Sequence, residues 1–345
     1  MTYLLAGDIG GTKTLLRLDR TKLATDPTFI KSYHSQAYPN LAAIVTEFIA
    51  AAQTQLGTKI EIESACLGIA GAVVNGASYL PNLDWQINAE GLAAALGIPT
   101  LELINDFTAI GYGITQLQSA DLHTLQTGQI RERAPIAIIG AGTGLGQGLL
   151  VHNGREYQVV ATEGGHADFA ARSIQEFDLV RYLCDRKQLD RISNERIISG
   201  SGIVAIYQFL RDTSNLSENS DIATVVQLWE SQPETAVDPA GAISAMAIAK
   251  TDPLAQATMQ MFVSAYGAEA GNLALRTLPY GGLFVAGGIA IKNIPLIADG
   301  TFLKEFNHKG RVSNLLTDIP VHVILNPQVG LLGAVAQAAR LGVKL

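Results

Sequence analysis

The chain alternates short apolar runs with amphipathic stretches along most of its length. The clearest helix is predicted for residues 40–57, where apolar residues recur with the 3.6-residue period. Asn40 is a good N-cap for this helix, and Gly57 stands where a glycine commonly follows a helix end. Residues 64–73 and 101–104 are short and mainly apolar, as in buried strands. Alternating strands and helices predict an α/β fold.

Helical periodicity is more frequent in the second half of the chain. We expect a short helix near 88–96 and then helices at 173–186, 200–211, 221–230, 238–249, 254–277 and 328–341. Strands are predicted at 281–289 and 322–325.

Residues 7–14, GDIGGTKT, differ from the phosphate-binding pattern G-x-x-x-x-G-K-[ST] at one position, where Thr12 replaces glycine. In that pattern the loop opens directly into a helix. Here the glycines lie between two strand-like runs, residues 3–7 and 15–18. A strand, a glycine turn and a second strand are therefore predicted instead.

A second glycine turn follows in IAIIGAGTGLGQGLLVHNG, residues 136–154. Its glycine spacing does not match the dinucleotide pattern G-x-G-x-x-G, and no helix follows at once. Two similar hairpins, one near the start of each half, indicate an internally duplicated protein with two domains.

Both glycine turns could hold phosphate oxygens with backbone N–H groups. Thr12 and Thr143 would each add a hydroxyl donor, and Asp8 could hold Mg²⁺ through water, since this ion keeps much of its hydration shell. The alternative is two tight hairpin turns without a ligand.

Asn105 and Asp106 follow an apolar strand and precede a helical pattern. In open α/β sheets the carboxyl ends of strands are where ligands bind. Asp106 could accept a proton from a substrate hydroxyl group, or it could simply cap the helix behind it.

Three further polar residues lie beside glycines. Glu163 and His166 flank Gly164 and Gly165, which argue against a metal-binding helix and favour hydrogen bonds to a polar substrate. The alternative is a loop glutamate and a histidine with protein partners. Glu195 is predicted in the first turn of a short helix capped by Ser193 or Asn194, a position that the helix dipole favours for an acid.

Composition excludes several classes of protein. Hydrophobic residues make up 48% of the chain and charged residues 16%, which is typical of a globular protein rather than a disordered one. The net charge of −7 without a basic run argues against nucleic acid or an anionic membrane as a partner. Two distant cysteines and an N-terminus without a basic region lead us to expect a soluble cytoplasmic protein.

Six motifs, in this order and spacing, resemble the bacterial glucokinase family of the hexokinase and actin-like ATPase superfamily: GDIGGTKT, LINDFTAIG, GAGTGLGQG, TEGGHADFA, NERIISGSG and GGLFVAGGI. The resemblance implies two ribonuclease H-like (actin-like ATPase) α/β domains with a cleft between them. We place the small domain at residues 1–115 plus 326–345 and the large domain at 116–325.

The resemblance also implies an activity, the ATP-dependent phosphorylation of glucose at its 6-hydroxyl group. Asp106 would be the general base, with Asn105, Glu163, His166 and Glu195 binding other sugar hydroxyls. ATP and Mg²⁺ would be held by Gly7, Asp8, Ile9, Gly10, Gly11, Thr12, Gly140, Gly142, Thr143 and Gly144, with Asp8 as the magnesium partner. A homodimer is implied as well.

Alternatives are a kinase for another hexose or hexosamine, and a non-catalytic sugar-sensing switch. Lys13 departs from the family pattern, in which asparagine is common, and resembles a related group of sugar kinases and repressors. The cysteine-rich zinc motif of that group is absent, so we expect Lys13 to affect the phosphoryl donor rather than the reaction.

Overall fold

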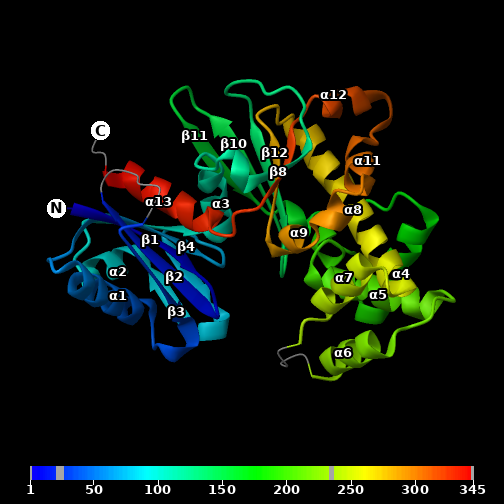
Figure 1. Cartoon of the computed structure of the whole chain (residues 1–345), viewed down its shortest axis with the longest axis horizontal. Helices are drawn as coiled ribbons and strands as arrows, with labels where there is room; N and C mark the ends of the chain where they lie inside the picture. Colours follow the sequence, from blue (N-terminus) through cyan, green and yellow to red (C-terminus); the bar gives the residue numbers. More distant parts are fainter. Residues whose placement is uncertain (1, 21–26, 233–236, 343–345) are drawn as a thin grey trace. The chain divides into compact units, whose positions relative to one another are not determined.

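The computed structural model describes residues 2–20, 27–232 and 237–342, and the chain divides into two compact units (Figure 1). Unit 1 comprises Met1–Asp121, Tyr157–Ala161 and Asn326–Leu345, and unit 2 comprises Leu122–Glu156 and Thr162–Leu325. In the part of the chain that is described, no helix is both long and apolar enough to cross a bilayer.

Unit 1 contains a five-stranded sheet with the order β3-β2-β1-β4-β7. Its strands are β1 (Thr2–Ile9), β2 (Lys13–Arg20), β3 (Phe29–His34), β4 (Glu61–Ile69) and β7 (Thr100–Asn105). β1 pairs with β2 in antiparallel fashion, which confirms the predicted strand, turn and strand around the first glycine run. β4 is parallel to both β1 and β7, so these three strands end at the same edge.

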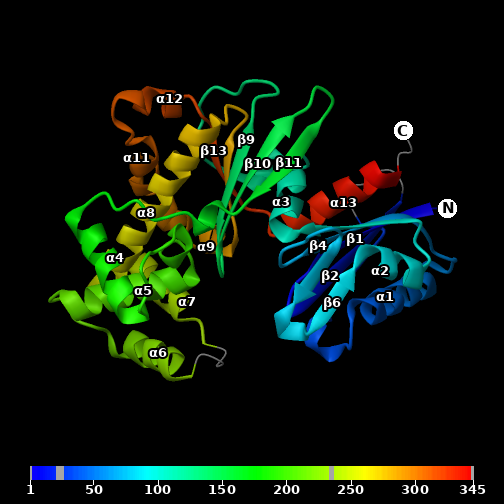
Figure 2. The ribbon, with the colours of Figure 1, turned by 180° about the vertical axis from the view of Figure 1, so that it is seen from behind.

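Helices cover both faces of this sheet (Figures 1 and 2). One face packs against α1 (Leu41–Leu56) and α2 (Ala89–Leu96), and the other against α3 (Asp106–Ile114) and α13 (Val329–Gly342). A hairpin of β5 (Ala77–Leu80) and β6 (Trp85–Asn88) was not predicted. The predicted ends of α1 are confirmed, because Asn40 accepts a hydrogen bond from the Ala43 N–H and Gly57 has a φ of 63°.

Unit 2 contains a six-stranded sheet with the order β11-β10-β9-β12-β13-β8. Its strands are β8 (Leu122–Gln126), β9 (Ile136–Ala141), β10 (Leu145–His152), β11 (Tyr157–Thr162), β12 (Leu283–Ala286) and β13 (Val321–Ile324). The strand expected at 281–289 is therefore too long. It ends where Gly287 takes a φ of 94°, and a short helix begins at Gly288.

The two sheets repeat one topology. In each, a hairpin made by the first two strands of the motif lies beside a later parallel strand: β1–β2 beside β4, and β9–β10 beside β12. The order third, second, first, fourth, fifth is the same in both, and β8 is an additional strand in unit 2. This shared order supports the predicted internal duplication.

The remaining helices belong to unit 2 and build its core with the sheet. Five were predicted within a few residues of their ends: α4 (Ile174–Lys187), α5 (Gly200–Thr213), α6 (Ser220–Ser231), α7 (Pro239–Ala249) and α8 (Pro253–Thr277). Four short ones were not predicted: α9 (Gly288–Lys292), α10 (Ile294–Ile297), α11 (Thr301–Asn307) and α12 (Ser313–Thr317). A helix of this length spans two turns at most, too few for a periodic pattern to be visible.

Candidate active site

The first glycine turn, residues 10–12, joins β1 to β2 and is closed by a hydrogen bond of 2.9 Å from the Gly10 N–H to the Lys13 carbonyl oxygen. The N–H groups of Gly11 and Thr12 have no partner among the described residues. Because such groups bind anions readily, the turn offers donors to a phosphate.

Ser35 braces this turn from the end of β3, a contact that the sequence pattern did not reveal. Its hydroxyl group donates to the Gly10 carbonyl oxygen at 2.8 Å, and its N–H donates to the Thr12 carbonyl oxygen at 2.9 Å. The Thr14 hydroxyl lies 3.0 Å from that of Ser35, and both residues are fully buried. The turn is therefore held in one shape before any ligand binds.

Asp8 lies one residue before the end of β1, and its side chain reaches solvent. Neighbouring protein still removes much of its hydration, which raises the pKa of the carboxyl group, and the Lys13 ammonium group opposes this shift. In the described parts of the chain, no three His, Cys, Asp or Glu residues are grouped to hold a metal ion. One carboxylate beside a turn with unpaired N–H groups fits Mg²⁺, which usually takes one or two carboxylates along with phosphates and water.

Asn105 caps the helix that follows β7, so the alternative in which Asp106 is the cap is wrong. The Asn105 Oδ1 accepts hydrogen bonds from the N–H groups of Phe107 at 2.9 Å and Thr108 at 3.3 Å. Its Nδ2 donates to the Gly71 carbonyl oxygen at 3.0 Å. The cap leaves Asp106 as the first residue of α3, where its carboxylate is available for another task.

Asp106 uses one carboxylate oxygen locally and leaves the other free. Its Oδ1 accepts a hydrogen bond of 2.8 Å from the Phe107 N–H, and Oδ2 has no partner among the described residues. Burial raises the pKa of the carboxyl group most strongly, and the negative charge of Asp8 raises it further. Hydrogen bonding by the Phe107 N–H and by the Asn105 side chain lowers it. The result is a stronger base than an aspartate in water.

The strand register explains why Asp8 and Asp106 influence each other. Ile9 in β1 is paired with Ile69 in β4, which is paired with Asn105 in β7. Three parallel strands thus end level with one another and bring the first glycine turn and the start of α3 to one edge of the sheet.

Glu163 and His166 lie in unit 2 on a single 3₁₀ turn, Gly164–His166, rather than on an α-helix. The His166 Nε2 lies 3.7 Å from the Glu163 Oε2, and both side chains are exposed. Gly165 is buried, and a Cβ atom there would collide with the Leu145 carbonyl oxygen of β10. The turn can rest directly on β10 only because both of its central residues are glycines.

Glu195 lies on another 3₁₀ turn, Asn194–Arg196, next to the second glycine turn. Its Oε2 accepts a hydrogen bond of 3.0 Å from the Leu145 N–H. Ser193 stands at the N-cap position and Glu195 in the first turn, as expected, but the Ser193 side chain makes no capping hydrogen bond. The N–H of Asn194 instead donates to the Ala167 carbonyl oxygen at 2.9 Å, which joins this turn to the one that carries His166.

The second glycine turn, residues 142–144, is closed by a hydrogen bond of 2.8 Å from the Gly142 N–H to the Gly144 carbonyl oxygen. The Gly142 carbonyl oxygen also accepts from the Gly200 N–H at 2.9 Å, at the N-terminus of α5. A helix N-terminus carries partial positive charge, which favours a bound anion. Unit 2 therefore brings a phosphate-type turn together with Glu163, His166 and Glu195.

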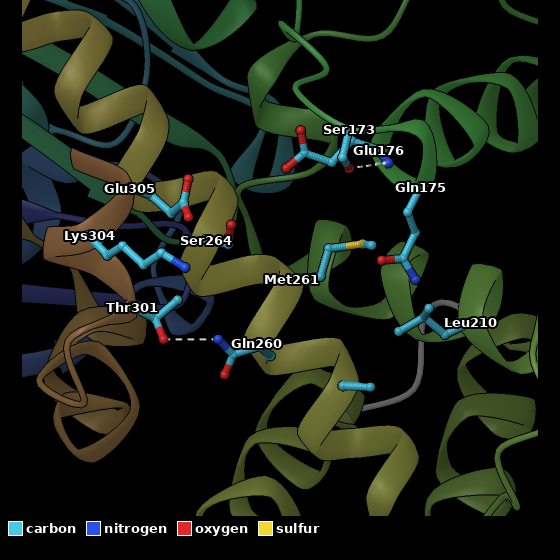
Figure 3. A pocket seen from close by; sticks show the side chains of 11 residues that line it. Ser173, Gln175, Glu176, Leu210, Gln260, Met261, Ser264, Thr301, Lys304 and Glu305 are labelled. Atoms are coloured by element: carbon cyan, nitrogen blue, oxygen red, sulfur yellow. Dashed lines mark hydrogen bonds between the residues drawn. The ribbon is translucent and has the colours of Figure 1, made fainter. Parts of the chain in front are cut away.

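A hollow of about 340 Å³ lies elsewhere in unit 2, among α4, α5, α8 and α11 (Figure 3). Glu176 and Glu305 line it and are both paired with Arg172. None of the predicted site residues contributes to this hollow.

Comparisons with known proteins agree with these local features. The family model described as Glucokinase matches residues 5–341. The glucokinase of Nostoc punctiforme is 54% identical over 99% of this chain and 100% of its own length, and that of a Synechocystis species is 47% identical over 97% and 98%. The crystal structure of a glucokinase from an Antarctic psychrotroph has a TM-score of 0.79 at 26% identity and covers 99% of both chains. The predicted fold, that of the actin-like ATPases, is confirmed by such neighbours, and the chain belongs to the glucokinase family.

Proposed function

We propose that the protein transfers the γ-phosphoryl group of ATP to the 6-hydroxyl group of glucose. Similarity to glucokinases over the whole chain supports this reaction. The observation in the structure that carries it is the free carboxylate oxygen of Asp106, on a residue that burial makes more basic, at the same sheet edge as a phosphate-type turn.

In this reaction Asp106 accepts the proton of the 6-hydroxyl group while the hydroxyl oxygen attacks the γ-phosphorus in line. The bond from the γ-phosphorus to the bridging oxygen breaks, and ADP leaves. A raised pKa suits the task, because a base works best when its pKa approaches the working pH.

Sugar binding is assigned to Asn105, Glu163, His166 and Glu195. The number of hydrogen bonds that each can offer follows from its protein partners. Asn105 has already used its carbonyl oxygen and one N–H, so at most one amide N–H is left for the sugar. Glu195 has used one carboxylate oxygen on Leu145 and retains the other. A polyol that leaves any of these groups unpaired is bound less tightly, which is the physical source of sugar selectivity.

The two glycine turns are assigned to the phosphates of ATP. Their free N–H groups stabilise negative charge on the transferring phosphoryl group without reorganising. Mg²⁺, when bound, neutralises charge on the phosphate oxygens, and Asp8 is the residue that would hold it, through water. The homodimer implied by the resemblance stays a prediction.

The test is an assay of the purified protein with MgATP and a panel of glucose, mannose, fructose and N-acetylglucosamine. We expect ADP to form with glucose at the highest kcat/KM, and the product to be a substrate for glucose-6-phosphate dehydrogenase. A higher kcat/KM for another sugar would identify a different hexose kinase. Absence of turnover with every sugar would favour the sugar-sensing switch.

Activity should also depend on pH through Asp106. The base acts only when ionised, and its pKa is raised, so kcat/KM should fall as the pH falls through a midpoint above the ordinary pKa of an aspartate. A pH profile of kcat/KM at saturating MgATP checks this. The acid limb should persist after His166→Gln, whereas its loss in that variant would assign the limb to the histidine.

A further inference from the structure

A buried carboxylate that the proposed reaction does not use lies in α8. Glu269 is 3% exposed, and its Oε1 accepts a hydrogen bond of 2.9 Å from the Nε2 of Gln147, which is also 3% exposed and belongs to β10. Burying a charge is costly unless it is paired and hydrogen-bonded. This pair therefore requires an explanation beyond packing.

The partners of Glu269 fix the direction of the Gln147 amide group. Both carboxylate oxygens accept: Oε1 also from Arg276 Nη1 at 3.3 Å, and Oε2 from Asn272 Nδ2 at 3.0 Å. Asn272 cannot turn its amide over freely, since its Oδ1 accepts from Lys309 Nζ at 2.8 Å. Because an ionised carboxylate can only accept, Gln147 must direct its Nε2 toward Glu269 and its Oε1 away.

That Oε1 lies against the turn that carries Glu163 and His166. A Cβ atom on Gly164 would collide with the Gln147 Oε1. The same turn is tied to the backbone of β10, because the Thr162 hydroxyl donates to the Gln147 carbonyl oxygen at 3.1 Å and accepts from the Gly164 N–H at 3.3 Å. The Gln147 side chain is thus the surface on which Gly164 rests.

We infer that Glu269 is a positioning residue for sugar binding, which acts through Gln147 on the turn that presents Glu163 and His166. The inference rests on the proposed function, since it assigns this turn to the sugar. An apolar pair of similar size would pack equally well in the core. A hydrogen bond from Gln147 to Glu269 fixes the orientation of the Gln147 amide group, which an apolar pair cannot do. A fixed amide group in turn holds Gly164 in one position.

The first variant is Glu269→Gln, which keeps the shape and removes the charge. An amide has one acceptor oxygen for donors that approach both oxygens of the carboxylate, so the bond to Gln147 or the bond to Asn272 must be lost. We expect the KM and the calorimetric Kd for glucose to rise ~3–30-fold, which corresponds to the loss of about one hydrogen bond. kcat and the KM for ATP should change less than about twofold, because a loss of uniform sugar binding leaves the chemical step intact.

The second variant tests whether the direction of the hydrogen bond from Gln147 to Glu269 matters, by exchanging the amide and the carboxylate. Gln147→Glu alone places two carboxylates together and should weaken glucose binding at least as much as Glu269→Gln does. In the double variant Gln147→Glu with Glu269→Gln, the amide introduced on α8 can donate to the carboxylate introduced on β10 and still accept from Asn272. We expect the double variant to recover most of the glucose affinity, which a merely looser fold would not do.

The matched control is Glu176→Gln, in the same unit. Glu176 is 5% exposed and accepts hydrogen bonds from the backbone N–H and the guanidinium group of Arg172, beside the hollow of Figure 3. We expect Glu176→Gln and Glu269→Gln each to lower the thermal midpoint, because each removes a buried hydrogen-bonded carboxylate. Glu176→Gln should leave the KM for glucose unchanged.

The outcomes separate the inference from the proposed function. If the unaltered chain binds and phosphorylates glucose while Glu269→Gln leaves the Kd for glucose unchanged, the inference alone is overturned. It is also overturned if the KM values for glucose and ATP rise together, or if the exchanged pair does not recover affinity. An unaltered chain that binds no glucose overturns both, whereas one that binds glucose without turnover contradicts only the proposed reaction.

Discussion

Asp106→Asn is expected to lower kcat by about 10²–10⁴-fold, the usual contribution of a general base, while glucose still binds. Asparagine has the same shape, and its Oδ1 can still accept the Phe107 N–H, so the start of α3 is retained. It cannot accept a proton, because the free carboxylate oxygen becomes an amide NH₂ group. Steady-state kinetics with glucose and MgATP, together with the Kd for glucose from calorimetry, measure the two effects separately.

The control for this substitution is Asp221→Asn, which removes the first-turn aspartate of α6. Like Asp106, Asp221 is close to an asparagine cap, since Asn219 accepts its N–H at 2.8 Å. Asp221 is not among the predicted site residues of either unit, so we expect Asp221→Asn to leave turnover unchanged. Near-normal turnover in Asp106→Asn would exclude Asp106 as the base, and loss of glucose binding would assign it a binding role instead.

Gly333→Ala should destabilise unit 1 by about 1–3 kcal/mol, the range found when a well-packed contact is overfilled. Gly333 lies where α13 crosses α3, and a Cβ atom there would collide with the Ala109 carbonyl oxygen. Gly113 of α3 makes the reciprocal contact with the Val329 carbonyl oxygen. Since α3 begins with Asp106, moving this helix should also lower kcat/KM.

A neighbouring glycine on the same helix provides the matched control. A Cβ atom on Gly330 would meet only the Ile110 Cγ1 atom at 3.7 Å, an ordinary contact. Alanine favours helix over glycine by about 1 kcal/mol, so Gly330→Ala should be neutral or stabilising. Thermal and urea denaturation midpoints compare the two variants. Equal midpoints would show that the close crossing of α3 and α13 does not limit stability.

Local chemistry made much of the fold predictable from the sequence. The ends of α1 follow from Asn40 and Gly57, and the two glycine hairpins follow from apolar runs on either side of each turn. Long helices such as α8 were visible because many turns repeat the same apolar period. Short elements such as α10 and β5 were not, because four residues carry too little pattern.

The candidate site, like the fold, was predictable from the sequence only in part. Asp106, Glu163 and His166 were proposed as site residues because each lies beside a strand end or a glycine pair, a signal within a few residues. The sequence left open whether Asp106 caps the helix, since Asn105 and Asp106 are adjacent and both residue types cap helices well. Only the backbone geometry decided that Asn105 makes the cap and Asp106 keeps a free oxygen.

By itself the sequence determined the α/β class, the duplicated hairpins, the family and which polar residues accompany the glycines, because these depend on neighbours along the chain. The tertiary structure alone decided which partners hold those residues in place. Ser35 bonds to the first glycine turn, the Leu145 N–H bonds to Glu195, and Gln147, bonded to Glu269, packs against Gly164. Ser35 is 25 positions from Gly10 along the chain, Glu195 is 50 from Leu145, and Glu269 is 122 from Gln147. Residues so distant become neighbours only through the pairing of strands and the packing of helices, which leave no periodic signal in the sequence.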